Sequence, residues 1–204
     1  MKTQENFKIR ASASGKLITE PRSKSETLSE TTKTYVKEWL TEKIYGIRKE
    51  IKSKYLDKGN ILEDTAIDKA IDWLDLPFAI KNEKFFEDEF FCGTPDLIVN
   101  DVVYDIKCSW DAFSFPLFES EIPTKDYFYQ LQVYMHLTGC KKAVLTYVLL
   151  NTPDFMIYEI KHDYDAMDKK YRIKTFEIDY NSEVIEKLQN KVENVREYLQ
   201  TLNY

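Results

Sequence analysis

Two short apolar runs near the middle of the chain predict an antiparallel β-hairpin. Residues 97–99 and 102–104 are rich in β-branched side chains and are too short for a helix. The dipeptide Asn100-Asp101 separates them, and both residue types tolerate the positive φ that a tight hairpin turn needs. Because side chains alternate along a strand, Asp105 and Lys107 are expected on one face of the second strand.

The charged residues of this hairpin are expected to converge. Asp96 opens the first strand directly after Pro95, and proline is tolerated at a strand start. Pairing about the turn brings Asp96 near Asp105 and Lys107, whereas Ile106 points the opposite way, into a core. Two carboxylates and one amine therefore share a small patch.

Helical periodicity surrounds the hairpin on both sides. Apolar residues repeat there at helical spacing, and capping residues mark where helices start and stop. The predicted helices are a short one within residues 10–18 capped by Ser12 or Ser14, one that starts at Ser29 and is interrupted at Gly46, a continuation of the spacing through Ile47, Ile51 and Tyr55, one that starts at Asn60, one over residues 124–138 and an amphipathic one over residues 181–202. The last is expected to pack on the domain or to form a subunit interface.

Three further segments predict strands. The phenylalanine-rich residues 85–91 precede the hairpin, with a turn at Gly93-Thr94. Residues 143–150 predict a buried strand, and residues 156–160 predict its hairpin partner. This order of elements predicts an α/β fold in which helices flank a mixed central β-sheet, with residues 1–204 forming a single domain.

The charged patch of the hairpin suits a divalent metal ion. Neighbouring carboxylates repel each other unless a cation lies between them, and Mg²⁺ and Mn²⁺ prefer such hard oxygen ligands. A lysine beside the metal can orient or deprotonate a water, or stabilise charge on a phosphate. These groups supply what metal-assisted phosphodiester hydrolysis needs. The alternative is an ordinary hairpin with solvated charges on its outer face.

The hairpin residues resemble a nuclease motif. Pro95-Asp96 followed by Asp105-Ile106-Lys107 is similar to the PD-(D/E)xK motif. Glu63 resembles the upstream helix glutamate of the group that includes lambda exonuclease and the YqaJ-like phage exonucleases. Residues 130–134 match the Gln-x-x-x-Tyr motif that RecB-type nucleases share with these exonucleases. Arg10 to Thr19 resembles, more loosely, the N-terminal segment with which such exonucleases hold a DNA end.

This resemblance covers residues 8–150 and implies an activity as well as a fold. It implies a restriction-endonuclease-like core over residues 59–161, an N-terminal DNA-end segment and loop at residues 1–28, and a C-terminal helix at residues 181–202. The implied activity is metal-dependent DNA exonuclease, hydrolysing phosphodiester bonds from the ends of duplex DNA in phage-type recombination. A restriction-type or structure-specific endonuclease of the same fold, or a non-catalytic nucleic-acid-binding protein, is the alternative.

The resemblance also assigns roles to residues. Mg²⁺, or Mn²⁺ in its place, would be held by Glu63, Asp96, Asp105 and the carbonyl of Ile106. Lys107 would position or activate the water, Gln130 and its helix neighbour Tyr134 would steady the substrate strand, and Arg10 and Ser12 would hold a terminal phosphate. The implied partners are DNA, further copies of this chain in a ring trimer, and a single-strand annealing protein.

The role of Glu63 has a second interpretation. This residue shares a helix face with Ile67, Ala70 and Leu74, so its carboxylate is expected to point toward the core and to need a partner. A metal ion or a metal-bound water is one such partner. The other is the backbone amide of Asn60, three residues earlier, in a capping box.

Charge and composition refine this interpretation. The 204 residues carry a net charge of −6, whereas DNA-binding domains are usually basic. The basic residues of the N-terminal segment nevertheless make it locally positive; they are Lys8, Arg10, Lys16, Arg22 and Lys24. A metal site that needs acidic ligands also accounts for part of the negative net charge.

Other classes of protein are disfavoured by what the sequence lacks. No apolar run approaches transmembrane length and the N-terminus has no signal-peptide pattern, so we expect a cytoplasmic protein without a membrane partner. Three widely spaced cysteines fit free thiols rather than a disulfide framework. Two histidines without ligand spacing disfavour a zinc site, and no glycine-rich phosphate loop indicates an ATPase.

Overall fold

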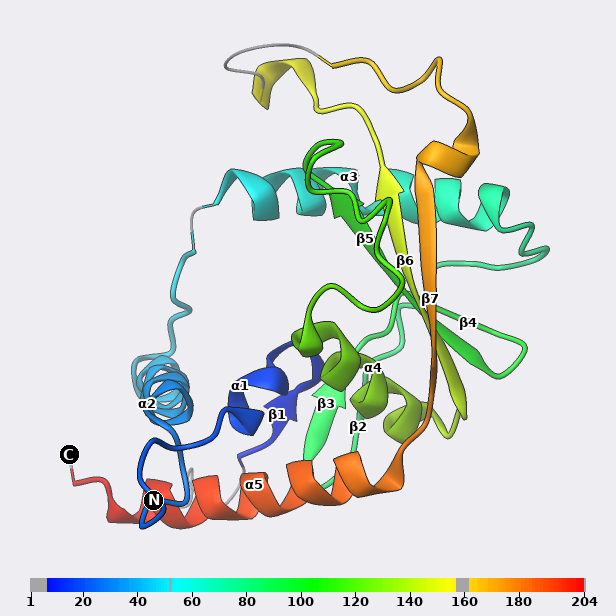
Figure 1. Cartoon of the computed structure of the whole chain (residues 1–204). Helices are drawn as coiled ribbons and strands as arrows, with labels where there is room; N and C mark the ends of the chain where they lie inside the picture. The colour runs from blue at the N-terminus through cyan, green and yellow to red at the C-terminus, as the bar shows by residue number, and fades with distance from the viewer. Residues whose placement is uncertain (1–6, 52, 157–161, 204) are drawn as a thin grey trace.

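The fold combines a four-stranded and a three-stranded β-sheet with helices around them (Figure 1). A computed structural model of the chain describes residues 7–51, 53–156 and 162–203. The larger sheet has the order β4 (Leu97–Val99), β5 (Val102–Ser109), β6 (Lys142–Leu149) and β7 (Ile173–Asp179). Its central pair, β5 and β6, is parallel, and both outer pairs are antiparallel. The sheet is therefore mixed, as the sequence predicts.

The smaller sheet and the helices complete the structure. The sheet has the order β1 (Ile9–Arg10), β3 (Phe91–Gly93) and β2 (Phe86–Glu87), with β1 and β3 parallel. The α-helices are α1 (Gly15–Ile18), α2 (Glu30–Tyr45), α3 (Lys54–Trp73), α4 (Lys125–Thr138) and α5 (Ser182–Thr201), and the short 3₁₀ turns are η1 (Ala11–Ala13), η2 (Asp154–Met156) and η3 (Lys169–Tyr171). Of the described helices, none is both long and apolar enough to cross a membrane.

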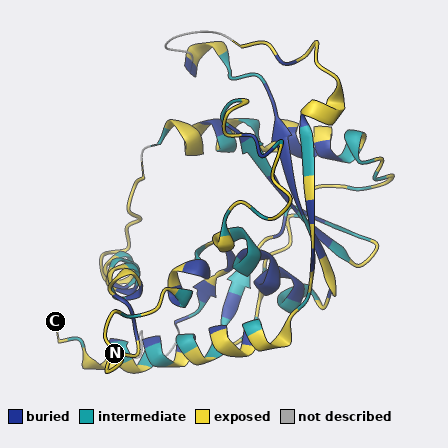
Figure 2. Cartoon of the chain, in the orientation of Figure 1, coloured by how far each residue is buried: buried dark blue, intermediate teal, exposed yellow. Residues whose placement is uncertain are grey.

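Helices α3 and α4 pack on β5 and β6, each with its own cluster of buried residues. Ile106 and Val148 belong to the cluster with Ala66 and Ile67 of α3. The second and larger cluster contains Val103 of β5 together with residues of α4 and α5. Figure 2 shows these strands and the facing side of α4 as buried. Because side chains alternate along β5, Asp105 and Lys107 lie on the face opposite Ile106, toward α4.

Several predicted elements are confirmed with their capping residues. The hairpin turns at Asn100 and Asp101, whose φ angles are 50° and 61°. Helix α4 ends at Gly139 with a left-handed φ of 81°, and α5 starts after Asn181, whose side chain accepts from two backbone amides. The apolar stripe of α5 faces the core: Ile185, Leu188, Val192, Val195 and Leu199 are all buried. The expected packing of this helix on the domain is confirmed.

Two helix predictions are wrong. Helix α2 ends at Tyr45 with Gly46 left-handed, and residues 47–51 do not continue it. Ile47 and Ile51 are mainly exposed, so the apolar spacing there has no core to pack against. Helix α3 starts at Lys54, six residues before Asn60. Asn60 is therefore inside the helix and cannot cap it, which rules out the capping-box interpretation of Glu63.

Two strand predictions also need correction. The segment 85–91 forms two short strands, because Asp88 accepts hydrogen bonds from the amides of Phe90 and Phe91 and closes a turn there. The antiparallel partner of β6 is β7, which the sequence analysis missed. The predicted strand at residues 156–160 lies mostly outside the described residues, and Met156 ends the 3₁₀ turn η2.

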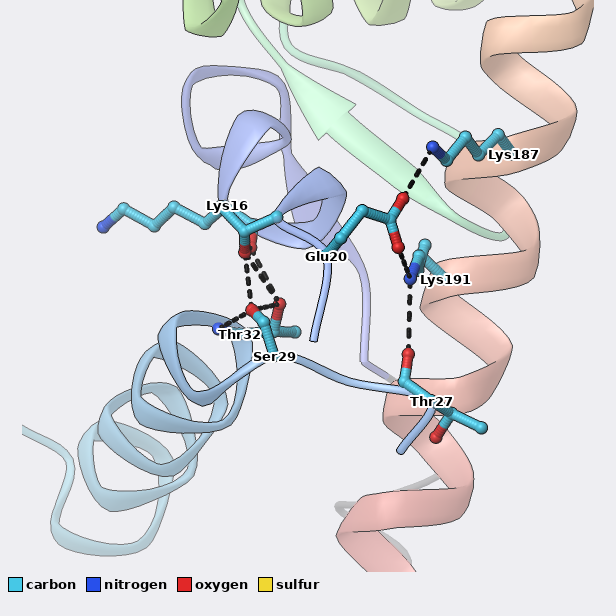
Figure 3. A network of polar contacts seen from close by, with 8 residues as sticks. Lys16, Glu20, Thr27, Ser29, Thr32, Lys187 and Lys191 are labelled. Carbon is cyan, nitrogen blue, oxygen red and sulfur yellow. Dashed lines mark hydrogen bonds and ion pairs between the residues drawn. The ribbon is translucent and has the colours of Figure 1, made fainter. Parts of the chain in front are cut away.

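A network of hydroxyl and charged groups fastens the N-terminal elements together (Figure 3). Ser29 caps α2 by accepting from the amide of Thr32, and the Thr32 hydroxyl donates to the carbonyl of Lys16 in α1. Lys187 of α5 pairs with Glu20 in the loop between α1 and α2. Helices α1, α2 and α5 are thus tied together by polar contacts as well as by apolar packing.

Replacing Ser29 with alanine is expected to lower the free energy of unfolding by about 1–2 kcal/mol, since it removes a cap and its bonds to Thr19 and Thr32. Urea denaturation measures the change. Ser25→Ala, in the exposed part of the same loop, is the control and is expected to change stability by less than about 0.5 kcal/mol. Equal effects of the two substitutions would contradict the capping role.

Candidate active site

A buried polar network joins β5 to α4. Asp105 is 1% exposed, and its Oδ1 accepts a hydrogen bond from Nε2 of Gln130 at 2.9 Å. The same Nε2 lies 3.1 Å from the hydroxyl of Tyr134, one helical turn further along α4. Lys107 Nζ lies 2.8 Å from Asp105 Oδ2. The structure therefore brings four of the predicted site residues into one connected cluster.

Asp96 joins this cluster through the backbone of β5. Its Oδ2 accepts a hydrogen bond from the Ile106 amide at 2.6 Å, as the pairing about the hairpin turn predicts. Burial, followed by repulsion from Asp105, raises the pKa of Asp96 to about 7. Lys107 and the Ile106 amide oppose that shift but do not cancel it. The site thus holds two carboxyl groups that disfavour each other's charge.

Lys107 is held as a cation. Burial alone would lower the pKa of its amine, but attraction to Asp105 and Asp96 outweighs burial and the pKa is raised. The ammonium group also lies over the ring of Tyr127 in α4, 4.9 Å from the ring centre. The Lys107 side chain is 25% exposed and Asp96 is partly exposed, so both reach solvent, whereas Asp105 is buried. Tyr127 is not among the predicted site residues; its position three residues before Gln130 on α4 is the sequence signal that places the two on one helix face.

The donor atoms of this cluster fit a hard divalent cation. Asp105 Oδ2 is buried and accepts no hydrogen bond from the described residues, apart from its ion pair with Lys107. Asp96 has a raised pKa that a bound cation would lower again. Within the described residues, no group of three histidine, cysteine or acidic side chains forms a ready cage. Mg²⁺ needs no such cage, because one or two carboxylates, a carbonyl, water and phosphate suffice.

Glu63 lies near the cluster but does not point into the core as predicted. Its side chain is 48% exposed, and its carboxylate pairs with Lys81 at 2.6 Å. Lys81 also pairs with Asp64 of the same helix. Glu63 nevertheless lies close enough to Asp96 to contribute to the raised pKa of that residue. The expectation of a buried carboxylate is therefore wrong, because a lysine from the following segment draws the side chain outward.

The two residues predicted to hold a terminal phosphate, Arg10 and Ser12, lie outside this cluster. Arg10 ends β1 and is exposed, and Ser12 is exposed in η1. Neither Ser12 nor Ser14 caps a helix with its side chain; the Ser14 hydroxyl instead donates to the Ala11 carbonyl. The short helix predicted within residues 10–18 is present as α1, with Ser14 at its N-cap position, but Arg10 is not part of it because Arg10 pairs with Cys92 of β3 as a strand residue. The segment nevertheless approaches the cluster, because Ala11 lies beside Gly93, and Gly93 lies against the ring of Tyr134.

Gly93 permits that close approach. A Cβ atom at this position would lie 2.7 Å from Cε1 of Tyr134 and 3.1 Å from Cβ of Ala11. Gly93→Ala is therefore expected to displace Tyr134 and to destabilise the fold by roughly 1–3 kcal/mol. Gly59→Ala, inside α3 where a Cβ meets no atom within 4 Å, is the matched control and is expected to be stabilising. Thermal unfolding of both variants compares the two; an undisturbed Gly93→Ala protein would contradict the tight packing.

The fold and the cluster together define a class of protein. A mixed sheet carries Pro-Asp and Asp-Ile-Lys on one hairpin, a glutamine on α4 contacts both the hairpin carboxylate and a tyrosine of the same helix, and helices cover both sides. This arrangement is that of a PD-(D/E)xK nuclease core.

Comparison with solved structures leads to a particular family. A phage-related exonuclease from Haemophilus somnus 129PT is 31% identical in sequence, with a TM-score of 0.82 over 95% of this chain and 94% of that chain. An alkaline exonuclease from Laribacter hongkongensis is 18% identical, with a TM-score of 0.71 over 96% of this chain and 89% of that chain. The structure of its complex with dAMP gives 19% identity and a TM-score of 0.69 over 97% and 89% of the two chains. No protein-family model and no curated protein sequence matches the chain.

The first of these similarities extends over nearly the whole of both chains at more than 30% identity. The chain therefore belongs to the phage-type exonuclease family of YqaJ-like and lambda-exonuclease relatives, within the PD-(D/E)xK nucleases.

Proposed function

We propose that this protein is a Mg²⁺-dependent deoxyribonuclease that degrades duplex DNA from its ends, and that Mn²⁺ can replace Mg²⁺. The observation that carries the proposal is the cluster in which Asp105 contacts both Lys107 and Gln130 while Asp96 binds the adjacent backbone amide. Two acidic side chains beside a cationic lysine are better explained as a site for phosphodiester hydrolysis than as an ion pair with a purely structural role. The neighbour solved with dAMP, a deoxynucleotide, supports DNA as the polymer.

Asp96, Asp105 and the Ile106 carbonyl would hold the metal ion, and Glu63 would join them after leaving Lys81. The ion would supply Lewis-acid stabilisation of negative charge on the scissile phosphate. Lys107, fixed between Asp105 and the ring of Tyr127, would orient the attacking water and donate to a phosphate oxygen. Gln130 would hold Asp105 in place and, with Tyr134, steady the substrate strand.

The remaining assignments concern the DNA end and the partners. Arg10 and Ser12, both exposed on the N-terminal segment, would contact a terminal phosphate. A role in phage-type recombination, a ring trimer of this chain and a single-strand annealing partner are what the family implies. Each of these is separate from hydrolysis and is tested by measurements of its own.

Digestion of labelled linear duplex beside covalently closed circles tests the exonuclease proposal. We expect loss of the linear DNA alone, only with Mg²⁺ or Mn²⁺, with the position of the label showing which end is entered. Cutting of the circles would favour a restriction-type or structure-specific endonuclease on the same fold. Binding without cutting of either DNA would favour a non-catalytic nucleic-acid-binding protein.

A further inference from the structure

A basic, aromatic groove lies between α2 and the small sheet, outside the cluster described above. Its volume is about 740 Å³, and its lining residues come from α2, the segment that follows α2, the N-terminal segment and the strands β1, β2 and β3. Six lysine or arginine residues and three glutamates line it. The chain as a whole carries a net charge of −6. The groove therefore concentrates positive charge on a protein that is otherwise acidic.

Four of the six cations are available to an anionic ligand. Within the groove Lys8 pairs with Glu87 and Lys49 pairs with Glu38. The other four make no ion pair among the described residues; they are Arg10, Lys16, Lys43 and Arg48. These four cations come from different parts of the chain, β1, α1, α2 and the segment after α2, and several separate positive charges suit a chain of phosphates better than a single small anion.

Aromatic rings alternate with these cations. Lys16 lies over the ring of Tyr35 at 4.8 Å, and Lys43 lies over Trp39 at 5.9 Å. Phe85 on the opposite wall is 52% exposed. Rings of this kind can stack on unpaired bases, whereas a duplex keeps its bases stacked inside and offers mainly phosphates. The combination of rings and cations thus favours a single strand.

The groove lies beside the cluster around Asp105. At one end of α2 the Thr32 hydroxyl donates to the carbonyl of Lys16 in α1 (Figure 3), whereas Lys43 and Arg48 line the groove at and beyond the other end of α2. On the floor, Cys92 is followed by Gly93, which packs against the ring of Tyr134. A strand in the groove would pass within a few residues of the network around Asp105.

We propose that this groove binds single-stranded DNA, namely an unpaired strand beside the duplex end that is being degraded. The proposal deepens the proposed nuclease function and rests on it for the source of the strand. Arg48 and Lys43 contact phosphates, and Phe85 stacks on a base. Arg10 lies where the groove meets the N-terminal segment and is shared between the two.

Binding of a fluorescent oligothymidylate, measured by anisotropy in EDTA, tests the proposal without hydrolysis. Phe85→Ala and Lys43→Glu are each expected to weaken binding by at least about fivefold. Phe78→Ala and Lys69→Glu are the matched controls, because both residues are exposed and lie outside the groove. Blunt duplex of the same length is expected to lose less than about twofold in affinity with Phe85→Ala, since its bases cannot stack there.

The outcomes separate this proposal from the proposed nuclease function. Groove variants that bind the oligothymidylate as tightly as the wild type would overturn it, even if the protein degrades DNA. Equal loss of single-strand and duplex binding in Phe85→Ala would overturn it as well, because the ring would then not read unpaired bases. If the wild type shows no nuclease activity but the groove variants selectively lose single-strand binding, the groove proposal is supported and the catalytic proposal is refuted.

Discussion

Replacing Asp105 with asparagine is expected to reduce hydrolysis of duplex DNA by on the order of 10³-fold, because it removes a carboxylate that would hold the charge-stabilising metal ion. The substitution removes the negative charge that holds Lys107 and that would face the metal ion. The asparagine carbonyl can still accept the hydrogen bond from Gln130, so the contact with α4 and the fold should persist, whereas the amide nitrogen in place of Oδ2 leaves the Lys107 ammonium without its partner. Nucleotide release under saturating Mg²⁺ measures the activity, and thermal unfolding checks the fold.

Asp101→Asn is the matched control for this prediction. Asp101 occupies the exposed hairpin turn at a φ of 61°, a conformation that asparagine adopts easily. The nuclease activity of the Asp101→Asn protein is expected to stay within about twofold of that of the wild type. A folded Asp105→Asn protein that retains more than a tenth of the wild-type activity would contradict the assignment of Asp105.

The raised pKa of Asp96 predicts that the metal-free protein loses stability as the pH rises. The unfolded chain releases this proton near pH 3.8, whereas the folded protein keeps it until about pH 7. Between those values the folded state binds more protons, so increasing pH disfavours folding, and the penalty is complete above pH 7. Its size is on the order of 1–4 kcal/mol. Mg²⁺ competes with the same proton, so Mg²⁺ affinity should increase with pH up to about 7.

Chemical denaturation in EDTA at pH 5 and pH 8, for the wild type and Asp96→Asn, isolates this contribution from other titrating groups. The difference in stability between the two proteins should move in favour of the asparagine variant as the pH rises. Mg²⁺ should then restore stability at pH 8 to the wild type alone. A stability difference that is independent of pH would contradict the raised pKa.

The local chemistry of turns and caps made much of the fold predictable. Asn100-Asp101 fixed the hairpin, and with it the neighbourhood of Asp96 and Asp105, because a two-residue turn leaves one register. The helices predicted over residues 124–138 and 181–202 match α4 and α5 closely, because Gly139 ends the first with a left-handed φ and the Asn181 side chain caps the start of the second. The two-residue period of β5 was enough to separate Lys107 from Ile106.

Features that depend on distant residues were not predictable. Lys81 lies 18 residues beyond Glu63 and turns that carboxylate outward, which no local pattern indicates. A lysine in this polar stretch of sequence is expected on the solvated face of a helix, yet Lys58 is buried. Its amine donates to the carbonyls of Ser109, Trp110 and Leu150. These contacts exist only once α3 packs across the ends of β5 and β6, so they follow from tertiary structure.

The strand β7 was missed for another reason. Its apolar and polar residues alternate from Thr175 to Asp179, which is a strand signal, but residues 156–160 were predicted to pair with β6. The long connection between β6 and β7 makes the pairing non-local, and a hairpin was the simpler choice.

The most direct test of the central claim compares the wild type with Lys107→Met on blunt linear duplex DNA, in EDTA and in Mg²⁺. Methionine keeps much of the apolar stem over Tyr127 but removes the charge that pairs with Asp105. The cluster predicts that only the wild type with Mg²⁺ releases nucleotides, and that the variant remains folded. Release in EDTA, release by Lys107→Met at the wild-type rate, or no release by the folded wild type would each contradict a metal-dependent nuclease site at Asp96, Asp105 and Lys107.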